Sequence, residues 1–233
     1  MPAMRCATCA IVMLGVTAHV TADTSKLIDG ERFSAKTIYE DRFEQLSPIW
    51  VLEGKPAVRA KHGKLHVDAS GEGPGRYATL WLNKELPSNV LIEYHARCPR
   101  QQTTAANLNQ FLMACEADGA DILSIQHSGD YKDYHSLPLY IITLTYKWSR
   151  LRKCPGFECV SERMDVRSGN EVRYRIRILK TGDRIRYFIN DAKVHDWTDT
   201  AGSYTSGKFG LRTWSTVVEY DNFRVYDVRD GAG

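Results

Sequence analysis

Short runs in which apolar and polar residues alternate follow one another along most of the chain. Gly, Pro, Asn and Asp separate these runs, and no stretch shows a convincing helical period. The predicted strands are Asp41–Phe43, Trp50–Glu53, Ala57–Lys61, Lys64–Asp68, Tyr77–Leu82, Asn89–Arg97, Gln110–Cys115, Ile122–Gln126, Leu139–Tyr146, Glu171–Lys180, Arg184–Asn190, Lys193–Thr198, Lys208–Thr213 and Val217–Tyr226. This spacing is typical of an all-β jelly roll, in which two antiparallel sheets pack as a sandwich.

One hairpin is predicted in residue detail. A two-residue turn at 182–183 places Ile178 opposite Tyr187 and Ile176 opposite Ile189, so one face is consistently apolar. The same alternation puts five arginines on the opposite face, which we expect to meet solvent. These are Arg173, Arg175, Arg177, Arg184 and Arg186. The alternative is a basic wall that faces a substrate.

The N-terminal 22 residues have the pattern of a secretory signal peptide. A basic start, Met1–Arg5, precedes a largely apolar run, Cys6–Val20, and the small residues Thr21 and Ala22 follow as a cleavage site. The apolar run is shorter than the ~20 residues of a membrane-spanning helix. We therefore predict a signal peptide at 1–22, no membrane span, and a secreted or periplasmic mature protein.

The remainder of the chain is predicted to hold one domain. Residues 23–38 show little periodicity and are expected to form an N-terminal tail, and 39–228 form the jelly roll. The formal net charge is only +3, whereas nucleic-acid binding usually needs a strongly basic domain. A nucleic-acid partner is therefore not expected.

Four cysteines lie outside the predicted signal peptide. An even count in an exported chain suggests disulfides, and four cysteines allow three pairings. We favour Cys154–Cys159, which would close a short loop, together with Cys98–Cys115. Free buried thiols remain the alternative. The spacing does not resemble a zinc site.

The chemistry of the chain is concentrated between residues 121 and 157. Arg150, Arg152 and Lys153 lie within four residues, and in an extended segment Arg150 and Arg152 project to one face and Lys153 to the other. Two parallel guanidinium groups suit the carboxylate of a uronate sugar. The alternative is a surface charge cluster.

Proton-transferring side chains lie just before this cluster. His127, Tyr134 and His135 are the candidate acid and base groups, since imidazole titrates near neutral pH. The sequence does not decide which of them would act. The alternative for each is a loop residue whose polar atoms form structural hydrogen bonds.

Aromatic residues provide candidate platforms for stacking on sugar rings. Trp148 lies next to the basic cluster, and Arg212 and Trp214 on a late strand are expected to face the same groove. Tyr140 and Tyr146 are better explained by packing between strands.

Carboxylates offer an alternative chemistry. Paired carboxylates are the usual equipment of glycoside hydrolysis, and Glu116, Asp118 or Asp130 would then carry it. Asp118 and Gly119 have the pattern of a turn, which weakens the first pair. Asp118 and Asp121 suggest at most a weak calcium site, and we predict no cofactor and no other metal.

Several segments resemble a known fold family. Residues 39–43, 63–67, 206–213 and 218–226 resemble concanavalin-A-like jelly rolls of bacterial carbohydrate-active proteins. Ser149–Phe157, preceded by His127-Ser128-Gly129-Asp130, resembles the YesU-like family more narrowly. The resemblance covers about residues 39–227 and implies a concanavalin-A-like β-jelly roll associated with the breakdown of acidic glycans.

These observations lead to three hypotheses for function. The first is a polysaccharide or oligosaccharide lyase, in which Arg150 and Arg152 hold the carboxylate and Trp148 stacks on a ring; Asp130 and Lys153 are further substrate-binding candidates. The second is a non-catalytic carbohydrate-binding domain. The third is a glycoside hydrolase, including one that acts on 3-keto sugars. Each predicts a carbohydrate partner and a monomeric protein.

Overall fold

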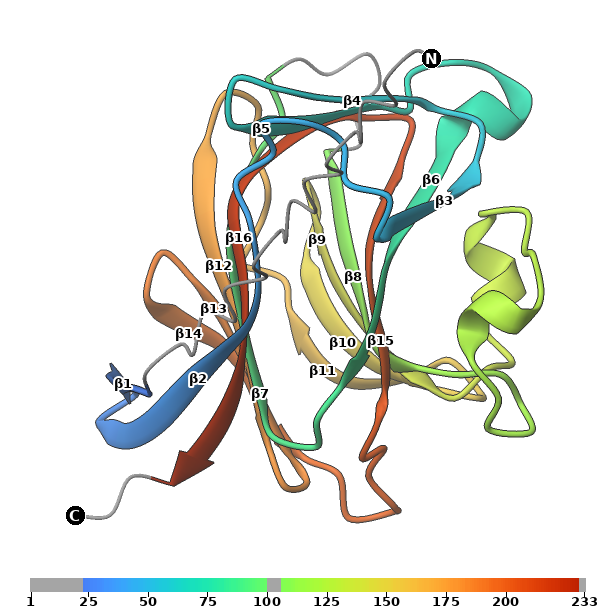
Figure 1. Cartoon of the computed structure of the whole chain (residues 1–233). Helices are drawn as coiled ribbons and strands as arrows, with labels where there is room; N and C mark the ends of the chain where they lie inside the picture. The colour runs from blue at the N-terminus through green and yellow to red at the C-terminus, as the bar shows by residue number, and fades with distance from the viewer. Residues whose placement is uncertain (1–22, 100–105, 231–233) are drawn as a thin grey trace, which may run out of the picture.

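The structure, a computed structural model, describes residues 23–99 and 106–230. Two antiparallel sheets face each other across the molecule (Figure 1). The larger sheet contains, in spatial order, β1 (Thr24–Ile28), β2 (Glu31–Asp41), β16 (Val217–Asp230), β7 (Val90–Arg97), β12 (Arg173–Thr181), β13 (Arg184–Ile189) and β14 (Ala192–Thr198). A hairpin of β4 (Ala57–Lys61) and β5 (Lys64–Asp68) joins it, because β5 pairs with β16.

The smaller sheet lies on the other side of the core. Its strands, in spatial order, are β11 (Glu158–Arg163), β10 (Ser149–Cys154), β9 (Leu139–Thr145), β8 (Asn107–Ala114), β15 (Gly207–Trp214), β6 (Tyr77–Leu86) and β3 (Trp50–Gly54). Three short 3-10 helices complete the described residues: η1 (Gly73–Arg76), η2 (Ile122–Ser124) and η3 (Tyr131–Tyr134). No helix in these residues is long and apolar enough to cross a membrane. The predicted all-β sandwich is confirmed, and the predicted signal peptide, 1–22, lies outside the described residues.

Alternate residues of both sheets point inward and form the main core. Leu80 and Leu82 of β6 lie in the same buried cluster as Ile92 and Tyr94 of β7. The residues between them on β6, such as Trp81, face away from the other sheet and belong to a second buried cluster. Successive residues of a strand therefore alternate between the core that separates the two sheets and the outer face of the sheet.

The predicted hairpin is correct in register. β12 and β13 pair Ile176 with Ile189 and Ile178 with Tyr187. The prediction that all the arginines on its other face meet solvent is wrong, because the side chain of Arg186 is only 1% exposed and its Nη1 lies 2.8 Å from Oε2 of Glu31.

Residues 23–38, predicted to be an N-terminal tail, cover part of this arginine face. Residues 24–41 instead form β1 and β2, and Phe33 and Ala35 of β2 pack against Leu91 and Phe188 in a third buried cluster. The tail prediction is wrong because the alternation of 31–35 is too short to be recognised without its partner strand, β16.

Two further segments differ from prediction. Ile122–Gln126, predicted as a strand, contains η2, and the carboxylate of Asp121 caps it by accepting a hydrogen bond from Leu123 N at 2.9 Å. The strand β11 was not predicted, because mostly polar residues fill both of its faces.

The predicted disulfides are contradicted, since all four described cysteines are free thiols. Cys98 is buried in the core between the sheets, where burial raises the pKa of its thiol to about 12, whereas Cys115 lies at the end of β8 beside Pro138. Cys154 is buried on the opposite face of the smaller sheet, and Cys159 is exposed. In neither predicted pair, Cys98–Cys115 or Cys154–Cys159, do the two cysteines lie in the same part of the structure.

A buried histidine joins the edges of the two sheets. His195 of β14 bonds through Nε2 to Ser149 Oγ at 2.9 Å and through Nδ1 to Ser161 Oγ at 2.8 Å. Burial, followed by the charge of Arg163, lowers the pKa of His195 from 6.5 to about 4. Between about pH 4 and pH 6.5, the His195 imidazole is therefore neutral in the folded protein but protonated in the unfolded chain.

We predict that this histidine makes folding stability fall in mild acid. Its contribution is constant above the unfolded pKa and is lost as pH falls from 6.5 toward 4. The full loss is roughly 3 kcal/mol. Urea unfolding at several pH values should show a steeper acid loss for the native chain than for His195→Gln. An equal loss of stability in the two proteins would contradict this role of His195. His62→Gln, at an exposed position, serves as the control and should lose stability in acid as the native chain does.

Candidate functional site

A groove lies on the face of the smaller sheet that points away from the other sheet. Its volume is about 600 Å³. Polar residues of the central strands form its floor, and residues of the 116–138 loop and of the β10–β11 turn form its wall. The floor contains Asn107, Asn109, Thr143, Thr145, Arg152 and Arg212; the wall contains Asp130, Tyr131, Lys132, His135 and Phe157; and Tyr77, Tyr146, Lys147, Trp148 and Trp214 complete the rim.

Strand register brings the floor residues together from distant parts of the chain. Arg212 of β15 pairs with Asn109 of β8, which pairs with Thr143 of β9. Arg152 lies on the next strand, β10, opposite Ile141. On one face of neighbouring strands, directly opposite side chains lie about 5 Å apart and diagonal ones, such as Arg152 and Thr143, about 7–8 Å apart. A single ligand can therefore reach all of these polar groups.

The two floor arginines are buried without a carboxylate partner among the described residues. Arg152 is 5% exposed and Arg212 is 3% exposed. Nη1 of Arg152 and Nε of Arg212 have no hydrogen-bond partner. Burial lowers the pKa of Arg212 to about 10, which still leaves it charged at neutral pH.

Aromatic rings hold these guanidinium groups in place. The Arg152 guanidinium lies 4.6 Å from the ring centroid of Phe157 and 5.2 Å from that of Trp148, and Arg212 lies 4.6 Å from that of Tyr131. Ring faces attract cations but leave the N–H donors in the guanidinium plane uncommitted. The arrangement leaves guanidinium N–H donors available to an acceptor in the groove.

His135 stands in the wall beside the arginines. Its ring stacks on Phe157 at 3.7 Å and meets the edge of Tyr131 at 4.7 Å, and its Nε2 is buried without a hydrogen-bond partner. Burial lowers the pKa of His135, and repulsion from Arg152 and Arg212 lowers it further. The imidazole is therefore neutral at pH 7 and can accept a proton.

Tryptophans stand on the rim, each supported by an arginine. Arg150 lies 4.0 Å from the ring of Trp148, and Arg76 lies 4.9 Å from the ring of Trp214. Both tryptophans are half-buried. A cation is attracted to the face of an indole, so each arginine stabilises the ring on which it lies.

A buried carboxylate anchors the loop that builds the groove wall. Glu53 of β3 accepts hydrogen bonds from Trp81 Nε1 and Tyr134 Oη, both at 2.6 Å, and from His127 N at 3.0 Å. Gly129 packs directly on Glu53, since a Cβ there would lie 2.9 Å from the Glu53 carbonyl oxygen. No other residue fits at position 129 without a shift of the backbone.

Six of the predicted site residues meet in the groove. They are Asp130, His135, Trp148, Arg152, Arg212 and Trp214. Asp130 also caps η3 by accepting from Lys132 N at 3.2 Å. The prediction that Arg150 and Arg152 share a face and Lys153 takes the other is correct.

The remaining predicted residues lie elsewhere. Tyr134 is fully buried on Glu53, and His127 Nε2 lies 2.7 Å from Glu116 Oε1, so both hold the loop. Arg150 pairs with Glu162 at the rim. Lys153 Nζ bonds Asp199 Oδ1 and Gly202 O, each at 2.8 Å, on the opposite face.

Some groove residues were not predicted. Asn107 and Asn109 extend β8 before the predicted strand start, and their polar alternation with Leu108 is the signal that identifies them. Phe157 was noted only as part of a motif. Glu53 carried no local signal, because its partners lie far away in the sequence.

The carboxylates considered for hydrolysis or calcium have separate roles. Glu116 pairs with His127, Asp118 forms a turn by accepting from Ala120 N at 3.0 Å, and Asp121 pairs with Lys208 at 2.9 Å. Within residues 23–99 and 106–230, no cluster of three or more His, Cys, Asp or Glu residues is arranged to hold a metal ion.

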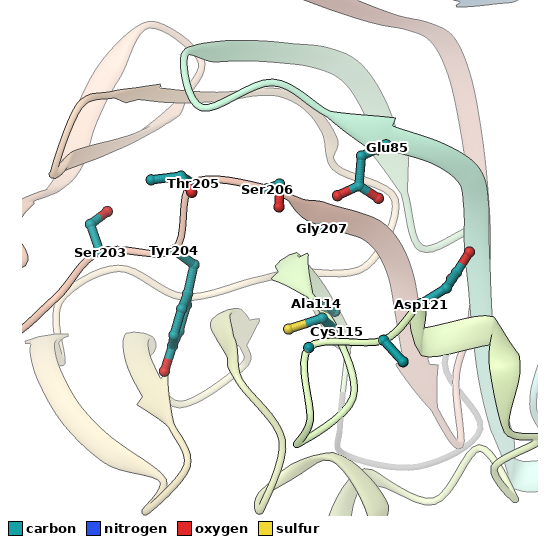
Figure 2. A pocket seen from close by; sticks show the side chains of 11 residues that line it. Glu85, Ala114, Cys115, Asp121, Ser203, Tyr204, Thr205, Ser206 and Gly207 are labelled. Atoms are coloured by element: carbon teal, nitrogen blue, oxygen red, sulfur yellow. The ribbon is translucent and has the colours of Figure 1, made fainter.

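A second cavity, of about 320 Å³, lies at the opposite ends of β8 and β15 (Figure 2). Glu85, Cys115, Asp121 and Tyr204 line it. Asp121 is paired there with Lys208. The groove is larger and holds buried donors without hydrogen-bond partners, so it is the better candidate for a binding site.

The comparisons with known proteins identify the family. A family model described as "Domain of unknown function (DUF6250)" matches residues 75–223, which include every groove residue. This chain belongs to the DUF6250 family. No curated protein matches this DUF6250 chain. The narrower likeness to the YesU-like family remains a prediction.

Solved structures share the fold of this DUF6250 protein at low identity. A Bacillus subtilis protein of unknown function with a galectin-like fold has a TM-score of 0.70 and 20% identity, covering 84% of this chain and 100% of its own. An endo-β-1,3-glucanase from Pyrococcus furiosus has 0.64 and 12%, covering 89% and 99%. The carbohydrate-binding module CBM66 from B. subtilis has 0.55 and 14%, covering 77% and 96%. These likenesses show the jelly-roll fold.

We predict that Glu53→Gln loosens the groove wall. The amide NH2 group of glutamine is a donor and would face the donors of Trp81, Tyr134 or His127. The loss of one hydrogen bond to a charged group costs about 1.5–3 kcal/mol. Urea unfolding should show this loss, whereas exposed Glu44→Gln should stay within about 0.5 kcal/mol of the native chain. Equal stability of Glu53→Gln and the native chain would contradict the anchoring role.

Proposed function

We propose that the groove binds an acidic, uronate-containing glycan, with a sugar carboxylate held between Arg152 and Arg212. The observation that carries this proposal is the pair of buried guanidinium groups without a carboxylate partner. A buried charge costs folding free energy unless an opposite charge compensates it. A bound carboxylate would provide that charge and accept two-pronged hydrogen bonds.

The remaining groove residues suit a sugar. Trp148 and Trp214 offer ring faces at the rim, and Asn109 offers an amide on the floor to sugar hydroxyls. The neighbours of known role are a carbohydrate-binding module and a glucanase, which supports a carbohydrate ligand on this fold. The predicted secreted or periplasmic location would place the protein where such glycans occur.

A second candidate function, β-elimination, is favoured by the neutral His135 beside the two arginines. Neutralising the uronate carboxylate would make its C5 proton removable. His135 would take that proton, the C5–H electrons would form the C4–C5 double bond, and the C4–O bond would break. Tyr131, which meets His135 edge-on, would donate a proton to the leaving oxygen.

Hydrolysis by paired carboxylates has less support. Asp130 is the one carboxylate among the described residues that line the groove. Glycoside hydrolysis generally uses two, placed on either side of the bond that breaks.

We predict that binding needs both floor arginines, Arg152 and Arg212. Arg152→Ala and Arg212→Met should each weaken binding of a trigalacturonate about 10- to 100-fold by calorimetry, because each removes a charged hydrogen bond. Arg184→Ala, whose side chain pairs with Asp196 on the larger sheet, is the matched control and should change affinity less than about threefold.

The same variants separate binding from structure. Arg212→Met should unfold at an equal or higher urea concentration than the native chain, because it removes a buried charge without a partner. Lost binding together with a large loss of stability would instead assign Arg212 a structural role.

Elimination has its own test. His135→Gln should retain trigalacturonate binding within about threefold but lose formation of ultraviolet-absorbing unsaturated products. In the native chain, product formation should fall in acid as His135 becomes protonated. Binding without any unsaturated product, across a panel of acidic glycans, would leave a carbohydrate-binding domain.

A further inference from the structure

A second basic site lies on the β4–β5 hairpin, which crosses the top of the molecule in Figure 1. A hollow of about 580 Å³ opens there, on the larger sheet. It is lined by Arg59, Lys61, His62, Lys64, His66 and Glu219. None of these residues belongs to the groove.

Strand register gathers these cations on one face. Arg59 pairs with His66, and Lys61 pairs with Lys64, across the hairpin. The alternate residues of β5, such as Leu65, are buried in the main core. The period of two therefore commits every second residue to the core and leaves a continuous basic face outward.

Negative charge on this face is insufficient for the cations. Glu219 is shared, since its carboxylate lies 2.9 Å from Lys64 Nζ and 3.9 Å from both His66 Nδ1 and Arg97 Nη1. Among the described residues, the ion pairs of Glu219 involve Lys64, His66 and Arg97 but not Arg59 or Lys61. Asp68 is the second carboxylate nearby, and its charge interacts with that of Arg59. The hollow therefore has a positive potential that attracts anions.

The hairpin starts beside the groove. Asp68, at the end of β5, pairs with Val217 of β16, three residues after the rim residue Trp214. Ser215 N also bonds Arg76 O, which ties the start of β6 to this corner. The base of the hairpin therefore lies at the corner where β15 passes into β16, at the Trp214 end of the groove.

We propose that the β4–β5 hollow is a second contact site for the same acidic polysaccharide, and that it binds uronates further along the chain than the one in the groove. This inference rests on the proposed function of the groove. A polyuronate carries a carboxylate on each residue, so several point charges fit the flexible lysine and arginine side chains. Two linked contacts raise affinity for the polymer without changing affinity for a short oligomer.

Acid should strengthen this second contact. Burial and the charges of Arg59 and Lys64 lower the pKa of His66, while Glu219 and Asp68 oppose them. Protonation of His66 in mild acid adds positive charge beside the bound carboxylates. Polymer affinity should therefore rise as pH falls from about 7 toward about 5, because carboxylates with ordinary pKa values near about 4 stay charged in this range.

The test compares polygalacturonate with trigalacturonate on the full chain. Arg59→Ser combined with Lys61→Ser should weaken polymer binding about three- to tenfold and leave trimer binding unchanged. The matched control, Arg32→Ser combined with Lys36→Ser, removes the same charge from exposed positions of β2 and should leave both affinities unchanged. Circular dichroism would confirm that all variants fold.

Several outcomes would overturn the inference. Unchanged polymer affinity in the hairpin variant, or an equal loss in the β2 control, would exclude a specific site. Anionic lipid vesicles that bind through Arg59 and Lys61 more tightly than polygalacturonate would assign the hollow to membranes. Failure of the native chain to bind trigalacturonate would refute the proposed function of the groove instead.

Discussion

The groove depends on one buried carboxylate. Glu53 on the edge strand β3 gathers hydrogen bonds from Trp81 on the sheet and from His127 and Tyr134 in the loop. A carboxylate without donors would be costly to bury, so the loop must close over it for the charge to be compensated. Closure buries the Tyr134 ring against Phe111 and Trp81 and places Tyr131 and His135 beside the floor arginines.

The floor arginines show the opposite balance. Glu53 accepts three hydrogen bonds from within the chain, whereas Arg152 and Arg212 are held by ring faces and keep unpartnered donors. Such groups lower stability and are expected where function requires them. The contrast between these charges, on one face of one sheet, separates residues that build the site from residues that would contact a ligand.

The local alternation of apolar and polar residues predicted most of the strands, but not the contacts between segments that are distant in the sequence. It gave the β12–β13 register and the opposite faces of Arg152 and Lys153, because side-chain direction in a strand is fixed by the backbone. It did not give the ion pair between Glu31 and Arg186, or the bonds from the 127–134 loop to Glu53, because those partners are distant in sequence. For this reason the sequence predicts His127 and Tyr134 as reactive groups, whereas the structure places them against the carboxylates of Glu116 and Glu53. The disulfide prediction failed for the same reason, since the cysteine count carries no information about which face each thiol occupies.

The most direct measurement is a side-chain NMR titration of the arginine Nε–H groups with trigalacturonate and, in parallel, with its methyl ester. The ester keeps the sugar rings and removes the negative charge. Our account predicts that the Nε–H signals of Arg152 and Arg212 shift with the acid and stay in place with the ester, while the signal of Arg184, paired with Asp196, moves with neither. Equal shifts with both ligands, or none with the acid, would contradict anion recognition in the groove.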